Sequence, residues 1–90
     1  MENATIMRLL RIKYDISTKE LADAVGISQQ YVSYIELGKH GQNESCALLM
    51  QKAFEKIIVQ RKNHIAGLSN SFAINRDRLL TFVMEGEYEL

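Results

Sequence analysis

Residues 17–39, STKELADAVGISQQYVSYIELGK, contain the start and stop signals of two short helices. Ser17 and Glu20 form a capping-box pattern, in which the serine oxygen accepts from the Glu20 amide and the glutamate reaches back. Gly26 stands where a helix commonly ends in a left-handed residue, and Ser28 is of the type that caps the next helix. The stretch therefore predicts two helices joined by a turn of a few residues.

Small and apolar positions in this stretch allow the two helices to cross at a steep angle. Ala22 lets the first helix approach its neighbour closely, and Gly26 supplies a backbone conformation that other residues resist. Val32 and Ile35 face inward on the second helix, and Ile27 is expected to be buried in the turn. This is the steric pattern of a helix-turn-helix, whose second helix enters the major groove of DNA.

The first turn of the second helix carries two adjacent amides, Gln29 and Gln30. In a helix-turn-helix these side chains face base edges, with Ser33 and Tyr34 one turn later. A glutamine amide offers one donor and one acceptor, which match N6 and N7 of adenine. The plainer interpretation is that both glutamines are solvated residues at a helix start, but their register with the inward-facing positions favours base reading.

A longer stretch carries a family resemblance. Residues 6–39, IMRLLRIKYDISTKELADAVGISQQYVSYIELGK, resemble the phage-repressor and Cro-like helix-turn-helix family, often called the XRE family. The pattern xSxxELAxxxGxSxxxVSxIExGK is present almost intact. The resemblance implies an all-α, lambda-repressor-like bundle of about five helices, with an extended fourth helix here. It places the base-reading positions on Gln29, Gln30, Ser33 and Tyr34.

The resemblance also implies an ion pair between Arg11 on the first helix and Glu36 at the end of the third. An arginine fork can bridge two helices bidentately, although two unrelated surface charges are the alternative. With these two residues, the positions expected to shape the motif are Ala22, Gly26, Val32, Ile35, Arg11 and Glu36.

Contacts to DNA phosphates are expected from hydroxyl and ammonium groups around these helices. The candidates are Thr18, Lys19, Ser28, Lys39 and Lys13. In the family a glutamine often stands at the position of Thr18, and many relatives have a basic loop after the glycine and lysine that end the motif. Here that loop is HGQNES, so we expect few phosphate contacts and a shallow dependence of binding on salt.

Beyond the motif, apolar periodicity predicts helices over residues 5–13, 44–63 and 76–85. HGQNES at 40–45 and GLSNS at 67–71 are predicted to be loops. No strand-like alternation is present, so the fold is predicted to be all-α. One face of the long helix is locally basic, which indicates either a second DNA-facing strip or an ordinary solvated face; its members are Lys52, Lys56, Arg61 and Lys62.

We expect residues 1–43 to form the helix-turn-helix core and residues 44–90 to complete the same domain. The first apolar residues of the long helix should continue the core: Cys46, Leu49, Met50, Ala53 and Phe54. A further set exceeds what a domain of this size needs and predicts a dimer interface: Ile57, Ile58, Ile65, Leu68, Phe72, Leu79, Leu80, Phe82 and Val83. The alternative is a larger monomeric core onto which the last helix folds back.

Composition narrows the functional classes. The chain has 90 residues, a formal net charge of zero and one cysteine, Cys46. We expect no disulfide, no metal site and no cofactor, and no apolar run is long enough to cross a membrane. No catalytic constellation is visible, so we predict that the protein is not an enzyme and that it is cytoplasmic.

Together these features predict a sequence-specific, DNA-binding transcriptional regulator, most like a repressor from a phage, a mobile element or a bacterial genome. A homodimer on a palindromic double-stranded operator would double the contacts of one weakly basic subunit. One alternative is an antitoxin that binds a small toxin and represses its own operon. Another is a protein-interaction adaptor without DNA binding, which the neutral charge favours.

Overall fold

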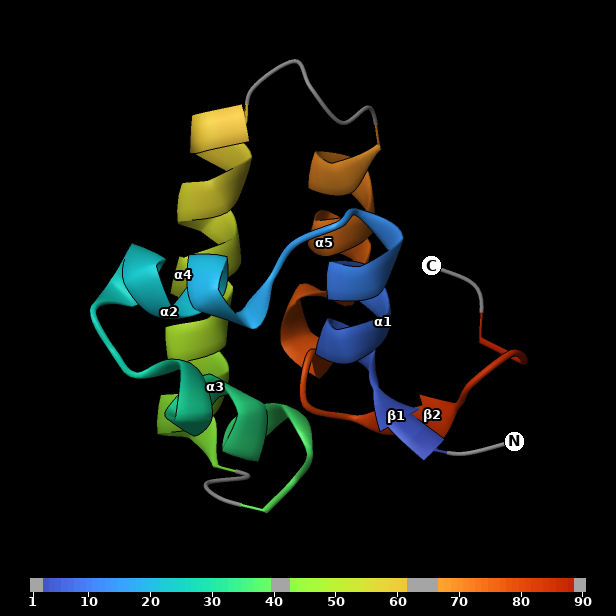
Figure 1. Ribbon diagram of the computed structural model, residues 1–90. Coiled ribbons are helices and arrows are strands. Elements are labelled where there is room, and N and C mark those ends of the chain that lie inside the picture. The colour runs from blue at the N-terminus through green and yellow to red at the C-terminus, as the bar shows by residue number, and fades with distance from the viewer. Residues whose placement is uncertain (1–2, 40–42, 62–66, 89–90) are drawn as a thin grey trace.

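The computed structural model describes residues 3–39, 43–61 and 67–88. Five α-helices dominate it, which confirms the all-α prediction, and two three-residue strands pair with each other (Figure 1). In chain order the elements are β1 (Asn3–Thr5), α1 (Ile6–Lys13), α2 (Thr18–Val25), α3 (Gln29–Glu36), α4 (Glu44–Arg61), α5 (Leu68–Asn75), the 3-10 helix η1 (Arg76–Arg78) and β2 (Phe82–Met84).

Side-chain caps start the helices where the sequence predicts. The Thr5 hydroxyl accepts from the Arg8 amide and begins α1. At the start of α2, both halves of the Ser17–Glu20 capping box are formed. The Asn43 side chain accepts from the Cys46 amide at 3.0 Å, and α4 begins at Glu44, where the long helix was predicted to start. Residues 40–42 of the predicted loop and 62–63 of the predicted long helix lie outside the described residues.

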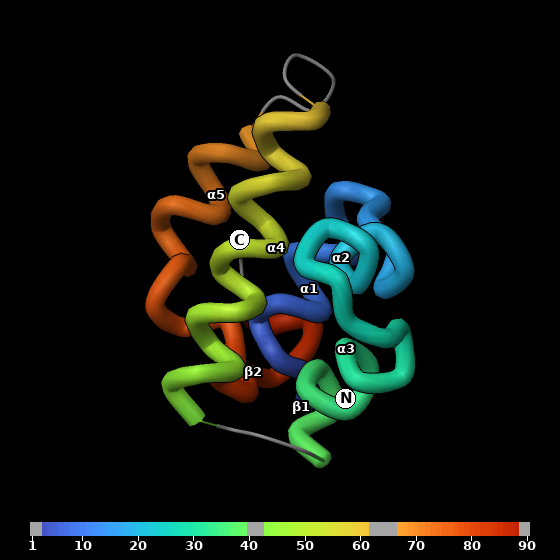
Figure 2. Tube along the Cα trace, turned by 90° about the vertical axis from the view of Figure 1, so that its left-hand side faces the viewer, coloured from blue at the N-terminus to red at the C-terminus, as the bar shows by residue number. Residues whose placement is uncertain are grey.

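The long helix α4 runs between the helix-turn-helix and α5 (Figure 2). On one side α2 packs against α4 and α3, and on the other α5 contacts both α4 and α1. The strands β1 and β2 lie at the same end of the molecule as α3 (Figures 1 and 2). This arrangement leaves the starts of α2 and α3 at the surface.

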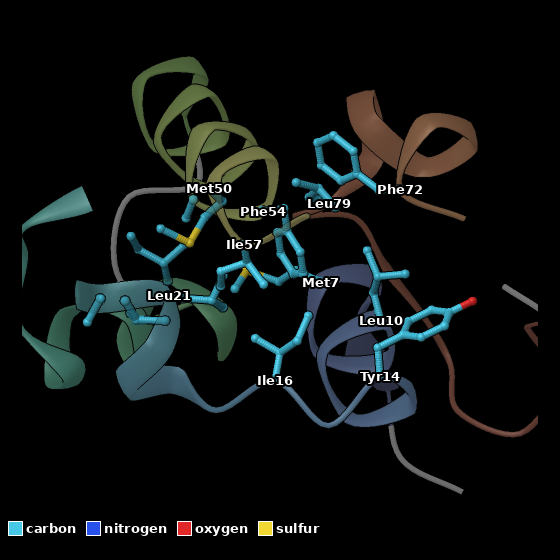
Figure 3. Packing of buried hydrophobic residues seen from close by; sticks show 14 of the residues in the cluster. Met7, Leu10, Tyr14, Ile16, Leu21, Met50, Phe54, Ile57, Phe72 and Leu79 are labelled. Atoms are coloured by element: carbon cyan, nitrogen blue, oxygen red, sulfur yellow. The ribbon is translucent and has the colours of Figure 1, made fainter. Parts of the chain in front are cut away.

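One hydrophobic cluster joins the two halves of the chain. Phe54 of α4 is fully buried near the middle of this cluster. Labelled side chains of α1, α2 and α5 lie around it (Figure 3). Its ring stacks on that of Phe72, with 5.8 Å between centroids. Since α4 supplies residues to both sides, the helix-turn-helix and the C-terminal elements share one core.

The C-terminal elements differ from the prediction. GLSNS was predicted to be a loop, but Leu68–Asn75 form α5, because Leu68 and Phe72 lie one turn apart and are both buried against the core. The predicted helix over 76–85 is wrong as well. After one turn of 3-10 helix, Phe82–Met84 pair with β1 instead.

Most of the apolar surplus that predicted a dimer interface is used inside the chain. Four members are buried: Ile57, Leu68, Phe72 and Leu79. Ile58 and Leu80 pack partly against the core, and Val83 is half-buried. Of the predicted set, Phe82 is exposed and Ile65 lies outside the described residues. These contacts match the alternative of a larger core within one chain, although the C-terminal segment does not fold back as a helix.

The end of α4 is fastened to the turn between α1 and α2 by Arg61. Its guanidinium donates to the carbonyl oxygens of Tyr14 and Asp15 at 2.9 and 3.0 Å. It also donates to both carboxylate oxygens of Glu20, at 2.6 and 2.7 Å. Arg61 therefore stabilises the turn that leads into α2. Because its guanidinium is bonded within the chain, Arg61 does not belong to the basic strip that the sequence indicated along α4.

Candidate nucleic-acid interface

The turn between α2 and α3 depends on the backbone of Gly26. Its φ is 72°, in the left-handed region, and the Ile27 amide donates to the Ala22 carbonyl at 3.0 Å. A Cβ added at Gly26 would meet no atom within 4 Å. The backbone angle, and not lack of space, is therefore what favours glycine here.

Gly26→Ala should lower the free energy of unfolding by about 1–2 kcal/mol, because a Cβ is strained in the left-handed region. Gly26→Asn should cost less, since asparagine tolerates this conformation. Urea titration followed by circular dichroism would measure both variants. Equal losses for alanine and asparagine would contradict a purely conformational role.

Buried residues fix the angle of α3 as the sequence predicts. Val32 and Ile35 are fully buried, and Ala22 on α2 is nearly so. Ile27, predicted to be buried, is half-buried and packs against the edge of the cluster. With one face of α3 held this way, Gln29, Gln30 and Tyr34 are exposed and Ser33 is half-buried.

Both glutamine amides are oriented by hydrogen bonds. Gln29 Nε2 donates to Thr18 Oγ1 at 2.9 Å, which links the starts of α2 and α3. Gln30 Nε2 donates to the Tyr34 hydroxyl at 2.6 Å within α3. Each amide uses one N–H in this way, so its oxygen and second N–H can face outward. The bond to Thr18 is not visible from the sequence, where this residue was a candidate for phosphate contact alone.

A buried ion cluster anchors the other end of α3. Glu36 is 2% exposed, and Arg11 donates to both of its carboxylate oxygens at 2.8 Å. Arg8 adds a third bond at 3.1 Å, and the Thr5 hydroxyl donates to the Glu36 carbonyl at 2.9 Å. The Arg11–Glu36 pair is thus present. Arg8 was missed, although its spacing of three from Arg11 puts both on one helix face.

The candidate phosphate contacts fall into two groups. Thr18 and Ser28 stand at the starts of α2 and α3, where backbone amides favour anions. The lysines are more scattered. Lys19 forms an exposed ion pair with Asp23 at 3.0 Å, and Lys39 is exposed beyond the end of α3. Lys13 lies on α1, with its ammonium 5.5 Å from the centre of the Tyr14 ring.

Tyr31 connects α3 to α4. Its hydroxyl lies 3.6 Å from the thiol of buried Cys46. The hydrogen bond with Cys46 raises the pKa of Tyr31 above its ordinary value, with smaller contributions from the charge of Cys46 and from burial. The phenol is neutral near pH 7 at its ordinary pKa already, and the contact with Cys46 keeps it protonated to higher pH.

The crossed helices α2 and α3, packed on an all-helical core with exposed amides at the start of α3, define a helix-turn-helix protein. A family described as helix-turn-helix matches residues 7–54, more than half of the chain. The chain belongs to this family, the XRE-type DNA-binding transcriptional regulators. No curated protein and no solved structure matches the chain.

Within residues 3–39, 43–61 and 67–88, no helix is both long enough and apolar enough to span a bilayer. The same part of the chain gathers no three side chains of the kinds that could jointly hold a metal ion.

Proposed function

We propose that the protein is a sequence-specific repressor of transcription that acts in the cytoplasm as a homodimer on a palindromic operator. The observation that carries this proposal is the pair of oriented amides at the start of α3. Gln29 is held by Thr18 and Gln30 by Tyr34, at 2.9 and 2.6 Å. Side chains fixed in this way are prepared to read bases instead of being ordered only on binding.

The chemistry of the two amides favours adenine. After its bond to Thr18 or Tyr34, each amide retains one acceptor and one N–H. This is the pair of groups that matches N6 and N7 of adenine in the major groove. We therefore expect each half of the operator to contain adenines at the positions faced by Gln29 and Gln30. Tyr34 adds an aromatic edge one turn along, which suits contact with a thymine methyl.

The charge distribution indicates that contacts to phosphates contribute only modestly to DNA affinity. The chain has no net charge, and Lys19 is already paired with Asp23. Each neutralised phosphate adds about 0.9 to the slope of log affinity against log salt. A subunit with few such contacts binds weakly alone, and a dimer doubles them. Affinity should consequently fall less steeply with salt than it does for a strongly basic repressor.

Replacing both Gln29 and Gln30 by alanine should leave folding intact and remove discrimination between operator and random duplex. At about 1–3 kcal/mol for each bidentate contact, the two losses together amount to a few kcal/mol. The duplex would be obtained by selection from a random pool with the wild-type protein. Binding would then be measured by fluorescence anisotropy at two salt concentrations.

Gln60→Ala is the matched control for this experiment, because Gln60 is an exposed glutamine on α4, outside the helix-turn-helix. It should leave both affinity and discrimination unchanged. If the double variant still distinguishes the selected duplex from random DNA, base reading by these glutamines is wrong. Failure of the wild type to bind any duplex at low salt would instead favour the adaptor without DNA binding.

A further inference from the structure

Two side chains on the outer face of α3 are joined to each other. Gln30 Nε2 donates to the Tyr34 hydroxyl at 2.6 Å, a contact between residues four apart on one helix face. Both side chains are exposed, and Tyr34 keeps 41% of its surface open. The backbone at Tyr34 is fixed as well, because its carbonyl accepts from the Lys39 amide at 2.9 Å. The bond therefore belongs to the exposed reading surface and not to the core.

The direction of this bond decides what the Tyr34 hydroxyl offers to a ligand. A phenol has one O–H donor and an oxygen that accepts. Because the oxygen accepts from Gln30, its own proton must point elsewhere. Within residues 3–39, 43–61 and 67–88, the structure shows no acceptor for that proton. Tyr34 therefore presents a hydrogen-bond donor to whatever approaches α3.

We propose that Gln30 and Tyr34 read two neighbouring base pairs as one unit, in which Gln30 selects adenine and the Tyr34 hydroxyl selects thymine. The inference rests on the proposed function and adds a specificity-determining hydroxyl to it. The unit presents three groups, which are the Gln30 oxygen, the second Gln30 N–H and the Tyr34 O–H. The first two match N6 and N7 of adenine. The third requires an acceptor beside that adenine.

The short distance between the two side chains limits where the hydroxyl falls on the duplex. Successive bases of one strand are about 3.4 Å apart along the axis, and Gln30 Nε2 lies 2.6 Å from the Tyr34 oxygen. Since adenine occupies both remaining groups of Gln30, the hydroxyl meets the next base pair. Orientation of the amide and choice of the neighbouring base are therefore coupled.

Thymine is the base that fits both the hydroxyl and the ring of Tyr34. In the major groove O4 of thymine accepts, whereas N4 of cytosine and N6 of adenine donate. A donor that faces another donor leaves both groups without a partner, which costs binding energy. Thymine also carries a methyl group beside O4, which can contact the ring edge. Guanine accepts through O6 and N7 but offers no methyl group.

The neighbouring amide provides an internal comparison. Gln29 is oriented from another helix, because its Nε2 donates to Thr18 Oγ1 at 2.9 Å. Loss of the Tyr34 hydroxyl should release Gln30 and leave Gln29 in place, and loss of the Thr18 hydroxyl should do the reverse. Tyr34→Phe and Thr18→Val are therefore matched variants, since each removes one hydroxyl and little volume.

The orientation of Gln30 can be measured without DNA. NMR relaxation of the side-chain amides reports their order on the fast timescale. We expect Gln30 to be more ordered than Gln60, which is exposed on α4. Tyr34→Phe should lower the order of Gln30 to that of Gln60, and Thr18→Val should not. Equal order of Gln30 in wild type and Tyr34→Phe would overturn the proposal.

Base reading by the hydroxyl can be measured on a duplex that the wild type selects from a random pool. The adenine whose selection is lost in Gln30→Ala marks the position of Gln30, and we expect thymine beside it. Replacing this thymine by 5-methylcytosine, paired with guanine, keeps the methyl group but turns the acceptor into a donor. Wild-type affinity should then fall roughly tenfold, and Tyr34→Phe should respond little. Selected duplexes without that thymine, or equal losses for wild type and Tyr34→Phe, would overturn the proposal.

The same titrations separate this inference from the proposed function. If the wild type selects no sequence, the proposed function fails, and the reading unit fails with it. If the wild type selects adenines for Gln29 and Gln30 but Tyr34→Phe discriminates against 5-methylcytosine as strongly as the wild type does, the function stands and the inference fails.

Discussion

Glu36→Ala should lower the free energy of unfolding by about 3 kcal/mol, because it leaves the Arg11 guanidinium without its counter-charge. Arg11 is 16% exposed and makes two of its hydrogen bonds to this carboxylate. Loss of the carboxylate would also free Arg8. Urea titrations of wild type and variant would give the difference.

Asp23→Ala is the matched control for Glu36→Ala. Asp23 also pairs with a cation, but both side chains of the Lys19–Asp23 pair are about two-thirds exposed, at 70% and 67%. Removal of an exposed pair changes stability by no more than about 1 kcal/mol. If Asp23→Ala and Glu36→Ala lowered the free energy of unfolding equally, burial of the Glu36 cluster would have no energetic consequence.

DNA affinity at 25 °C should also fall for Glu36→Ala, because the end of α3 loses its anchor to α1.

Phe54→Ala should lower the free energy of unfolding by about 3–5 kcal/mol, at least as much as Glu36→Ala does. Phe54 is fully buried and its ring stacks on Phe72, so alanine leaves a cavity between α4 and α5. A domain of this size has a total stability of roughly 5–13 kcal/mol, so the variant is expected to be close to unfolding at 37 °C. Thermal unfolding followed by circular dichroism would show this directly.

Two further substitutions test whether the cavity is the cause. Leu48→Ala on the same helix removes a side chain that is 54% exposed, and it should change stability little. Phe54→Leu keeps an apolar side chain at the buried position and should lose less than Phe54→Ala. An equal loss for Leu48→Ala and Phe54→Ala would mean that helix propensity, and not packing, dominates at α4.

The helix-turn-helix could be predicted because its signals are local. The partners of the capping box are three residues apart, and Gly26 marks the turn by its own backbone angle. Inward positions follow the helical period within a few residues. Each of these features depends on neighbours in the sequence, so a single chain carries enough information to place α2 and α3.

The segment after α4 could not be predicted in this way. Residues 67–71 are rich in glycine, serine and asparagine, which have low helix propensity. They are helical nevertheless, because burial of Leu68 and Phe72 against the core outweighs propensity. Conversely, Phe82–Met84 fit an apolar helical pattern but also have high strand propensity. Their partner is β1, at the other end of the described chain, which no local pattern reveals.

For the candidate site, residue types were easier to predict than their contacts. The sequence places Gln29 and Gln30 at the start of a helix, and the structure puts them there. That Gln29 is held by Thr18, and that Arg8 joins Arg11 around Glu36, depends on how helices cross. Such contacts require the three-dimensional angle between elements, and therefore they appear only in the structure.

Pairing of β1 with β2 encloses all five helices in a single loop of chain. Closing a long loop costs chain entropy, and two strands of three residues recover little of it. The helices, in contrast, form from neighbouring residues on a microsecond timescale. We therefore expect the helices to assemble first and the strands to join last.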